Sequence, residues 1–254
     1  MHNISFSIVI VNYQSQKNLE KCLASVLGKT KNIPAEIIVV NNDLNENLEN
    51  ISQKFPDVKI ISARKNLGFG AGCNLGVSEA NGEILFFLNP DTQIDLGNFS
   101  DISTLFQKNN NLGIVGANIL TPEKTPQDWT HGPEMDIFNL IKNNLKINLE
   151  ISPKADWVSG TALFIPKKIF QELGGFDEKF FMYFEDVDLG KRTRALGKKV
   201  LHFPNFSVIH LSGQSYTNHR LQKKHYYTSQ QYYFKKHQSK WEYFLVKLAQ
   251  KIFL

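Results

Sequence analysis

The sequence predicts an α/β protein in which helices flank a mostly parallel central sheet. The main observation is a series of predominantly apolar runs of strand length in the first 90 residues: FSIVIVNY, AEIIVVNN, VKIISA and EILFFL. Such runs are typical of strands buried on both faces, as in a parallel sheet covered by helices. Right-handed crossovers then place the carboxyl ends of these strands along one edge, where ligands bind in open α/β folds.

Spacing and composition predict the helices between these strands. After the first strand, apolar side chains recur at the positions of one helix face, namely Leu19, Cys22, Leu23, Val26 and Leu27. Residues 70–82, GAGCNLGVSEANG, predict a short helix of small residues that ends at Gly82.

The second half of the chain is less regular. Strands are predicted at residues 113–120, 157–166 and 200–210, and helices at 167–175 and 182–199. Residues 121–155 are polar, weakly patterned and contain four prolines, so we expect either a mobile loop over a site or a surface excursion. The sequence contains no internal repeat.

Composition limits the class of protein. The 254 residues fit one large α/β domain or two small ones, and 42% apolar with 21% charged residues are ordinary for a soluble chain. A net charge of +5 favours an anionic partner without choosing among nucleic acid, nucleotide and membrane. Cys22 and Cys73 are predicted to be reduced core residues. The chain starts with a strand and not a signal peptide, and no apolar stretch approaches the roughly 18 residues of a membrane span, so we expect a cytoplasmic protein.

Polar side chains follow three of the predicted strands. Because carboxyl ends of parallel strands converge, these side chains would form one polar edge suited to a nucleotide and a metal ion. The three strand exits are Asn12-Tyr13, Asn41-Asn42-Asp43 and Asn89-Pro90-Asp91-Thr92.

Asp91 has two interpretations. Asn, Pro and Asp are common where a strand turns, so a purely structural role is one of them. The other is ligation of Mg²⁺ or Mn²⁺, which often bind through one or two carboxylates together with substrate phosphates. His210, at the end of the strand FSVIH, would be a second ligand for Mn²⁺, or else a core or surface residue.

Three acids, Glu185, Asp186 and Asp188, lie near the start of the helix at 182–199. Acids there complement the helix dipole, an effect of only about 0.3–1 kcal/mol per charge. This effect leaves unexplained the apolar run FFMYF that precedes them. A carboxylate beside so much apolar surface tends to have a raised pKa, which suits a general base.

The glycine-rich segment NLGFGAGCNLG, residues 66–76, is not a dinucleotide-binding motif. Cys73 and Leu75 occupy positions where G-x-G-x-x-G would need glycine, and the segment follows a loop. Its glycines instead allow the backbone to approach phosphate or a neighbouring strand.

Residues 219–254 form a basic, aromatic tail with helical spacing. This pattern fits an amphipathic helix at an anionic membrane surface, although a helix docked on its own domain is an alternative. Nucleic acid is a third option, but no recognised binding module accompanies the aromatics, so we expect no nucleic-acid partner. The apolar face comprises Trp241, Phe244, Leu245, Leu248 and Ile252, with Lys240, Lys247 and Lys251 off it.

Taken in order along the chain, these segments resemble the family 2 inverting glycosyltransferases, which have the Rossmann-like GT-A fold. The resemblance covers residues 6 to about 215. Its segments are SIVIVNYQSQKNLEKCLASV, EIIVVNND, NLGFGAGCNLGVSEANGEILFFLNPDT, WVSGTALFIPKKIFQELGGFDEKFFMYFEDVDLGKRTRALG and VIHLSGQS. The rhamnosyltransferase-like branch is the most similar. The resemblance implies transfer of a sugar from a nucleotide-diphosphate donor, dTDP-rhamnose or a UDP-sugar, to a saccharide or lipid-linked saccharide in bacterial surface polysaccharide synthesis.

The resemblance also implies roles for individual residues. Asp91 and His210 would hold the divalent metal, Mn²⁺ or Mg²⁺, and Asp186 would be the catalytic base, with Glu185 beside it. The donor side would comprise Val11, Asn12, Tyr13, Asn41, Asn66, Gly68, Gly72, Asn74, Asn89, Pro90 and Asp91. The acceptor side would comprise Trp157, Gly160, Tyr183 and Glu185. We expect a glycosyltransferase domain at 1–218 and a tail at 219–254 that contacts the membrane peripherally.

Two departures from the family pattern matter. Asn41-Asn42 stands where many relatives have Asp-Asn, and Asn89 replaces the first carboxylate of the metal motif. No Q-x-x-R-W motif is present, so we expect transfer of one sugar and not polymerisation. The alternatives are a nucleotidyltransferase, whose Gly-rich basic loop is lacking after the first strand, and a non-catalytic glycan- or nucleotide-binding protein. The oligomeric state is left open.

Overall fold

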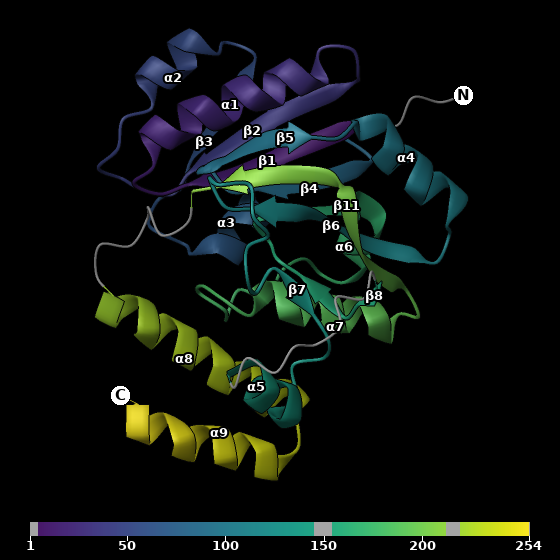
Figure 1. The fold of residues 1–254 in the computed structure, drawn as a ribbon. Coiled ribbons are helices and arrows are strands. Elements are labelled where there is room, and N and C mark those ends of the chain that lie inside the picture. Colours follow the sequence, from purple (N-terminus) through teal and green to yellow (C-terminus); the bar gives the residue numbers. More distant parts are fainter. Residues whose placement is uncertain (1–4, 145–153, 212–218, 254) are drawn as a thin grey trace.

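The computed structural model describes residues 5–144, 154–211 and 219–253 (Figure 1). Its first half contains the predicted parallel strands, which pair in the order β3-β2-β1-β4. β1, β2 and β4 are mostly apolar and largely buried, as expected for the centre of a sheet covered on both faces, whereas β3 at the edge buries only Val58. The strands are β1 (Phe6–Asn12), β2 (Ala35–Asn41), β3 (Val58–Ser62) and β4 (Ile84–Leu88).

The sheet continues with strands from the second half, in the order β10-β6-β11-β5. β10 pairs antiparallel with both β4 and β6, while β11 runs parallel to β6. β5 and the short β8 pair antiparallel with β11. The predicted α/β class is confirmed, with β10 as an antiparallel insertion. The bounds are β5 (Thr92–Leu96), β6 (Leu112–Leu120), β8 (Lys154–Ala155), β10 (Ala162–Pro166) and β11 (Lys199–His210).

The predicted strand at 157–166 is interrupted. β9 (Trp157–Val158) pairs with β7 (His131–Gly132) in a separate two-stranded sheet, and β10 begins only at Ala162. The turn between them, Ser159 to Thr161, leaves the main sheet because the hydroxyl of Ser159 bonds the backbone and side chain of Thr161. This turn faces the candidate site.

Helices cover both faces of the sheet (Figure 1). The predicted first helix is confirmed, because Leu19, Cys22, Leu23 and Val26 lie on its buried side. The helices in this part of the chain are α1 (Gln16–Thr30), α2 (Glu49–Lys54), α3 (Phe69–Val77), α4 (Phe99–Lys108), α6 (Lys167–Glu172) and α7 (Glu185–Ala195).

Several predicted helix boundaries were wrong. α3 ends at Val77 and not at Gly82, which instead packs against the backbone of Ser7 so closely that a Cβ would lie 2.5 Å from its nitrogen. α7 runs from Glu185 to Ala195 and not from residue 182 to 199. It cannot start earlier because Tyr183 and Phe184 adopt left-handed backbone angles (φ 69° and 67°) that are incompatible with a right-handed helix.

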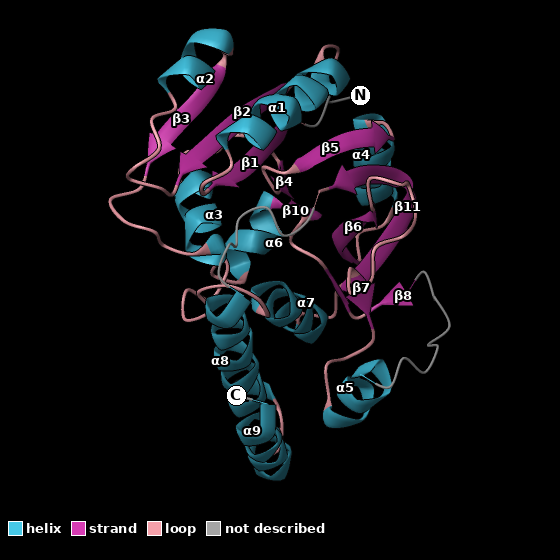
Figure 2. Cartoon of the chain, turned by 60° about the vertical axis from the view of Figure 1, so that its left-hand side comes forward, coloured by secondary structure: helices cyan, strands magenta, loops and turns pink. Residues whose placement is uncertain are grey.

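The segment 121–155 is not an unstructured loop, because it contains β7 and the helix α5 (Ile137–Asn144). Its residues 145–153, and residues 212–215 of the VIHLSGQS segment, lie outside the described part of the chain. The tail forms two helices, α8 (His219–His237) and α9 (Lys240–Phe253), which lie side by side below the sheet (Figure 2). Buried apolar residues of α5, α7, α8 and α9 pack together in one cluster, so the tail is docked on the rest of the chain. Among the described residues, no helix is long and apolar enough to cross a membrane.

Candidate active site

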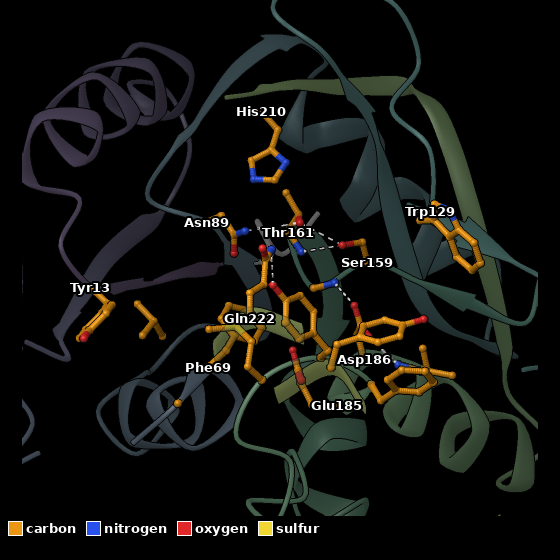
Figure 3. Close-up of a pocket in the computed structure, with 18 of the residues that line it drawn as sticks. Tyr13, Phe69, Asn89, Trp129, Ser159, Thr161, Glu185, Asp186, His210 and Gln222 are labelled. Carbon is orange, nitrogen blue, oxygen red and sulfur yellow. Dashed lines mark hydrogen bonds between the residues drawn. The ribbon is translucent and has the colours of Figure 1, made fainter. Parts of the chain in front are cut away.

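A cavity of about 670 Å³ lies beyond the carboxyl ends of β1 and β4 (Figure 3). Predicted site residues that line it come from both halves of the sequence, as the resemblance implied. They are Val11, Tyr13, Asn66, Gly68, Asn89, Pro90, Asp91, Trp157, Gly160, Tyr183, Glu185, Asp186 and His210.

Asp91 sits in a turn that several hydrogen bonds hold in place. The carbonyl oxygen of Asn89 accepts from both the backbone N–H (3.3 Å) and the hydroxyl (2.7 Å) of Thr92. The carbonyl of Asp91 accepts from the N–H of Leu211, at the end of β11. Pro90 restricts the backbone between these contacts. The strand exit therefore presents the Asp91 carboxylate to the cavity in one orientation.

His210 faces Asp91 across the cavity wall. Its Nε2 lies 3.2 Å from Oδ1 of Asp91, and its Nδ1 lies 2.9 Å from the side-chain oxygen of Gln127. The contact with Gln127 occupies the Nδ1 side of the ring and leaves Nε2 facing the carboxylate. An imidazole nitrogen and a carboxylate oxygen aimed at one point suit a divalent cation.

A metal ion at this point would need further ligands from elsewhere. The described residues contain no group of three or more His, Cys, Asp or Glu side chains that could hold a metal. Mg²⁺ and Mn²⁺ commonly bind through one or two protein ligands while phosphate oxygens and water complete the shell. The residues present therefore fit a metal that arrives with a diphosphate.

The second acidic group of the cavity is Glu185 and Asp186, in the first turn of α7. Asp186 accepts hydrogen bonds from the backbone N–H of Gly160 and of Val187, each at 2.8 Å. Burial raises the pKa of Asp186, although these N–H groups act in the opposite direction. The carboxylate is thus held by backbone donors at the cavity wall.

Glu185 is the more strongly perturbed of the two acids. Burial, together with the charges of Asp186 and Asp188, raises the pKa of Glu185 well above its ordinary value. Its Oε2 atom is buried and has no hydrogen-bond partner among the described residues. A neutral carboxyl group in this position can donate a hydrogen bond to a ligand in the cavity.

Close backbone packing brings the glycine-rich segment to this acidic pair. The N–H of Phe69 donates to the carbonyl of Phe181 at 3.0 Å. Gly68 has φ 82°, and a Cβ there would overlap the same carbonyl, so only glycine fits. This contact holds residues 66–69 against the chain that leads into α7.

Four residues assigned to the donor side do not line the cavity. Asn12 and Asn41 both turn to Glu46, with hydrogen bonds of 2.6 and 2.8 Å. Gly72 packs against the side chain of Val11, and Asn74 donates to the carbonyl of Phe176. Their contacts support the walls of the cavity from behind.

The cavity also contains residues that the sequence did not single out for the site. Asn42 is one of them, and it donates to Asn66 and Gly68 while it accepts from the N–H of Leu67, which organises that loop. The others come from distant segments that no local spacing connects: Phe69, Trp129, Met135, Ser159, Thr161, Met182, Phe184, Val187, Gln222 and Tyr226.

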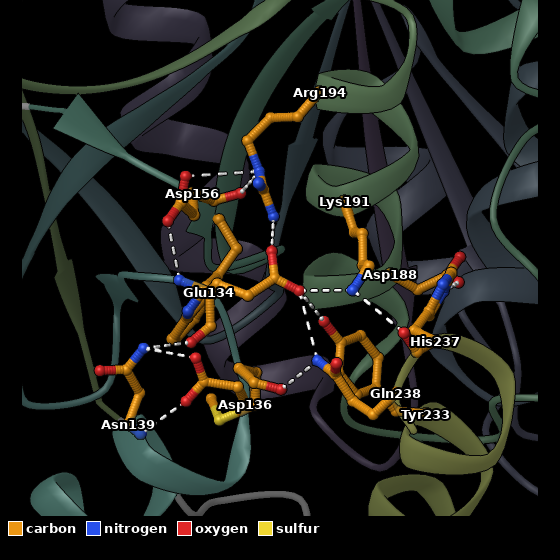
Figure 4. Close-up of polar contacts among 12 residues, drawn as sticks. Glu134, Asp136, Asn139, Asp156, Asp188, Lys191, Arg194, Tyr233, His237 and Gln238 are labelled. Atoms are coloured by element: carbon orange, nitrogen blue, oxygen red, sulfur yellow. Dashed lines mark hydrogen bonds and ion pairs between the residues drawn. The ribbon is translucent and has the colours of Figure 1, made fainter. Parts of the chain in front are cut away.

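A polar network behind the cavity ties α7 to α8 and to the chain before α5 (Figure 4). Glu134 accepts from Lys191 (2.6 Å), Arg194, Tyr233 and Gln238. Asp188 is fully buried and contacts Arg192, Lys236 and His237, each at 2.6 Å. Acidic side chains shared among several partners in this way hold the helix that carries Asp186 in place.

Comparison with known proteins identifies the family. Residues 7–174 match the profile of Glycosyl transferase family 2. The chain belongs to glycosyltransferase family 2. This glycosyltransferase is similar to the low-salt glycan biosynthesis hexosyltransferase Agl10 of Haloferax volcanii, with 28% identity over 74% of this chain and 61% of the relative. It is also similar to the N-acetylglucosaminyl-diphospho-decaprenol L-rhamnosyltransferase of Mycobacterium tuberculosis (25% identity, 82% of this chain, 76% of the relative) and to rhamnosyltransferase WbbL of Escherichia coli K12 (26%, 80% and 82%).

Solved structures confirm the GT-A fold of this family 2 chain. GalNAc-T7 with UDP, GalNAc and Mn²⁺ superposes with a TM-score of 0.68 at 18% identity, over 82% of this chain and 44% of that one. The mannosyltransferase PcManGT of Pyrobaculum calidifontis, in complex with GDP-Man and Mn²⁺, gives 0.66 at 13% identity, over 93% and 64%. The chain therefore spans less than two thirds of either neighbour, and of the H. volcanii relative.

Proposed function

We propose that this glycosyltransferase moves one sugar, with inversion, from dTDP-rhamnose or a UDP-sugar to a saccharide or lipid-linked saccharide in surface polysaccharide synthesis. The observation that carries the proposal is that one cavity contains both the Asp91–His210 pair and the Glu185–Asp186 pair. Rhamnose is favoured because two of the relatives described above are named rhamnosyltransferases.

The donor occupies the side of the cavity formed by Val11, Tyr13, Asn66 and Gly68. The ring of Tyr13 offers a surface for stacking of the nucleobase. The side-chain amide of Asn42 already donates hydrogen bonds to Asn66 and Gly68. Asn42 therefore shapes the donor side of the cavity, and backbone groups there contact the ribose or base.

Asp91 and Nε2 of His210 would hold a divalent metal, Mn²⁺ or Mg²⁺, which when bound neutralises charge on the departing diphosphate. Asn89, one residue before Pro90, donates through its side chain to Thr161 at 3.4 Å. That amide therefore positions the turn and leaves the carboxylate of Asp91 as the charged group of the motif.

Asp186 acts as the general base. Its carboxylate takes the proton of an acceptor hydroxyl as that oxygen bonds to the anomeric carbon and the bond to the diphosphate oxygen breaks on the opposite side. Attack from that side inverts the anomeric centre. A pKa raised by burial brings the base closer to the working pH, where proton transfer is more effective. Glu185 beside it, in its protonated form, would donate a hydrogen bond to the acceptor.

The acceptor occupies the aromatic side of the cavity, lined by Trp129, Trp157, Tyr183, Phe184 and Tyr226. Sugar rings present apolar faces that pack against aromatic rings, while their hydroxyls reach the acids of α7. A cytoplasmic location, with residues 219–254 in peripheral contact with a membrane, belongs to the same proposal.

A donor screen tests the proposal. Native protein with Mn²⁺ is heated with UDP-, dTDP- and GDP-sugars, beside Asp91→Ala and Asp186→Asn, with exposed Asp57→Asn as the matched control. One nucleotide class should stabilise the native chain, Asp186→Asn and Asp57→Asn, since a ligand at about 100 times its Kd adds ~2.7 kcal/mol. The thermal shift should disappear in Asp91→Ala. Sugar transfer should disappear in Asp186→Asn but persist in Asp57→Asn. No shift with any donor would overturn the proposal.

A further inference from the structure

Exposed apolar side chains gather on two helices at one end of the molecule. Among the described residues, eleven large apolar side chains are strongly exposed, and six of them belong to α5 and α9. Figures 1 and 2 both show α5 and α9 on the side of the molecule away from β1–β4. The six are Phe138, Ile141, Trp241, Phe244, Leu245 and Leu248, called here the α5–α9 face.

The packing of α9 turns its polar side inward and leaves the apolar side out. Glu242 and Gln250 are buried, together with Val246. Glu242 accepts from the hydroxyl of Ser239 (2.6 Å) and the N–H of Ile137 (3.3 Å), and Gln250 donates to Gln230 (2.5 Å). A terminal helix that only completed a core would bury its apolar stripe instead. This orientation is therefore held by specific hydrogen bonds and presents the apolar face to the surroundings.

The exposed charges of α5 and α9 are all basic. Lys240, Lys247 and Lys251 of α9 and Lys142 of α5 are exposed. Glu242 is the one acid in residues 219–254, and it is buried. A second copy of the chain would bring the same lysines and no exposed acid of α9 to pair with them. An anionic lipid bilayer complements both the apolar side chains and the lysines.

The same elements form the acceptor side of the cavity. Met135 lines the cavity and also packs with Ile137 and Leu140, the buried residues of α5. Gln222 and Tyr226 of α8 line the cavity as well, and α8 supports α9. Only two residues separate Met135 in the cavity wall from Phe138 on the exposed face.

We propose that the α5–α9 face docks on an anionic lipid bilayer, so that an acceptor carried by a membrane lipid reaches the aromatic side of the cavity. The proposal rests on the proposed transferase function for the nature of the acceptor. It adds that α5, outside the tail, is part of the docking surface, and that Trp241 and Phe244 enter the interface while Glu242 and Gln250 hold the helix to the protein.

Vesicle sedimentation of the full chain tests the docking face. Vesicles of phosphatidylcholine, with or without phosphatidylglycerol, are incubated with native protein, Phe244→Ser/Leu248→Ser, Phe138→Ser/Ile141→Ser and Lys240→Gln/Lys247→Gln/Lys251→Gln. Because all these side chains are exposed, the variants should fold. Matched controls replace equally exposed residues far from the face: Leu44→Ser/Leu96→Ser for the apolar pairs and Lys21→Gln/Lys31→Gln/Lys108→Gln for the lysines.

We expect the native chain and both controls to bind the anionic vesicles more tightly than the neutral ones. Each apolar pair should weaken binding about 10-fold or more, and the lysine triple about 100-fold. Absence of vesicle binding, or binding that none of the α5 and α9 variants weakens, would overturn the proposal. So would light scattering that shows a native dimer converted to a monomer by Phe244→Ser/Leu248→Ser.

The donor screen separates this proposal from the transferase function. If the native chain binds a donor with metal but does not sediment with vesicles, the proposed sugar transfer stands and the docking proposal fails. If the native chain binds vesicles through α5 and α9 but binds no donor, docking of the α5–α9 face stands and the proposed sugar transfer fails.

Discussion

The backbone N–H of Gly160 donates to Oδ2 of Asp186 at 2.8 Å and thereby joins the turn after β9 to the first turn of α7. The two residues are 26 positions apart in the sequence. Their contact orients the proposed base relative to the sheet that carries the donor side. A small displacement of this turn should therefore affect chemistry more than donor binding.

Gly160→Ala tests this relationship. A Cβ at Gly160 would lie 2.8 Å from the ring of Phe69, so the turn must move and take its N–H away from Asp186. We expect kcat to fall ~10- to 100-fold, because misplacement by about 1 Å can have an effect of that size. Donor-induced thermal stabilisation should persist. Gly28→Ala, where nothing lies within 4 Å of the added Cβ, is the control and should leave kcat unchanged; an unchanged kcat in Gly160→Ala would contradict the prediction.

The pH dependence of transfer should reveal the base. Burial raises the pKa of Asp186, and the base works only when deprotonated, so kcat should fall on the acid side at a higher pH than an ordinary aspartate would dictate. Asp186→Asn should lose ~10²- to 10⁴-fold in kcat and this acid limb with it. Rates measured from pH 5 upward test both statements. An Asp186→Asn profile that keeps the same limb would assign the titration to another group.

Asp188 should stabilise the fold in a pH-dependent way. Although burial opposes it, hydrogen bonds from His237 and Lys236 and the charge of Arg192 lower the pKa of Asp188 from 3.8 to about 2. A lowered carboxyl pKa stabilises the folded state above the unfolded pKa, and this contribution is lost as pH falls from about 4 to about 2. The shift corresponds to about 2 kcal/mol.

Urea unfolding of Asp188→Asn measures that contribution. At pH 7 the variant should be less stable than the native chain by at least ~2 kcal/mol, since its basic partners lose their counter-charge. The difference should shrink as the pH approaches 3. The exposed Asp57→Asn serves as the control and should match the native chain throughout. A difference that does not vary with pH would show that the carboxylate charge is not the cause.

Gln127 should affect metal binding without touching the metal. Its side-chain oxygen, 2.9 Å from Nδ1 of His210, directs Nε2 towards Asp91. Loss of a hydrogen bond that orients a metal-binding histidine typically weakens affinity ~10- to 100-fold. Titration of Mn²⁺ with a nucleoside diphosphate, followed by electron paramagnetic resonance, should show this loss in Gln127→Met. Gln53→Met, at an exposed position, should bind as the native chain does; equal affinity in both variants would exclude an orienting role for Gln127.

The sequence predicted the elements whose burial leaves a plain pattern. Strands β1 and β4 are almost entirely apolar because both faces are covered, and α1 shows one apolar side because only one faces the sheet. The short strand β5 and the helix α5 were not predicted. β10 was predicted as part of a longer strand, but its antiparallel insertion was not, because a buried run does not reveal the direction of its neighbours.

The candidate site was predicted only in part. Asp91, Asp186 and His210 follow from local patterns and from the resemblance, and the structure places all three around one cavity. Gln127 and Tyr226 could not have been found in this way. Gln127 meets His210 across 83 residues, and Tyr226 reaches the cavity because α8 packs against α7. No local spacing encodes either contact.

For the C-terminal helix, the sequence by itself determined a periodic apolar stripe, lysines beside it, and so an amphipathic helix. Only the tertiary structure decided which side of that helix meets the protein. Both sides compete for the same position: the apolar side gains by leaving water, whereas Glu242 and Gln250 gain hydrogen bonds to Ser239, Ile137 and Gln230. Ser239 directly precedes the helix and forms a local cap with Glu242, whereas Ile137 and Gln230 lie on other segments and act only once the chain has folded. They turn the polar side inward and leave Trp241 and Phe244 exposed.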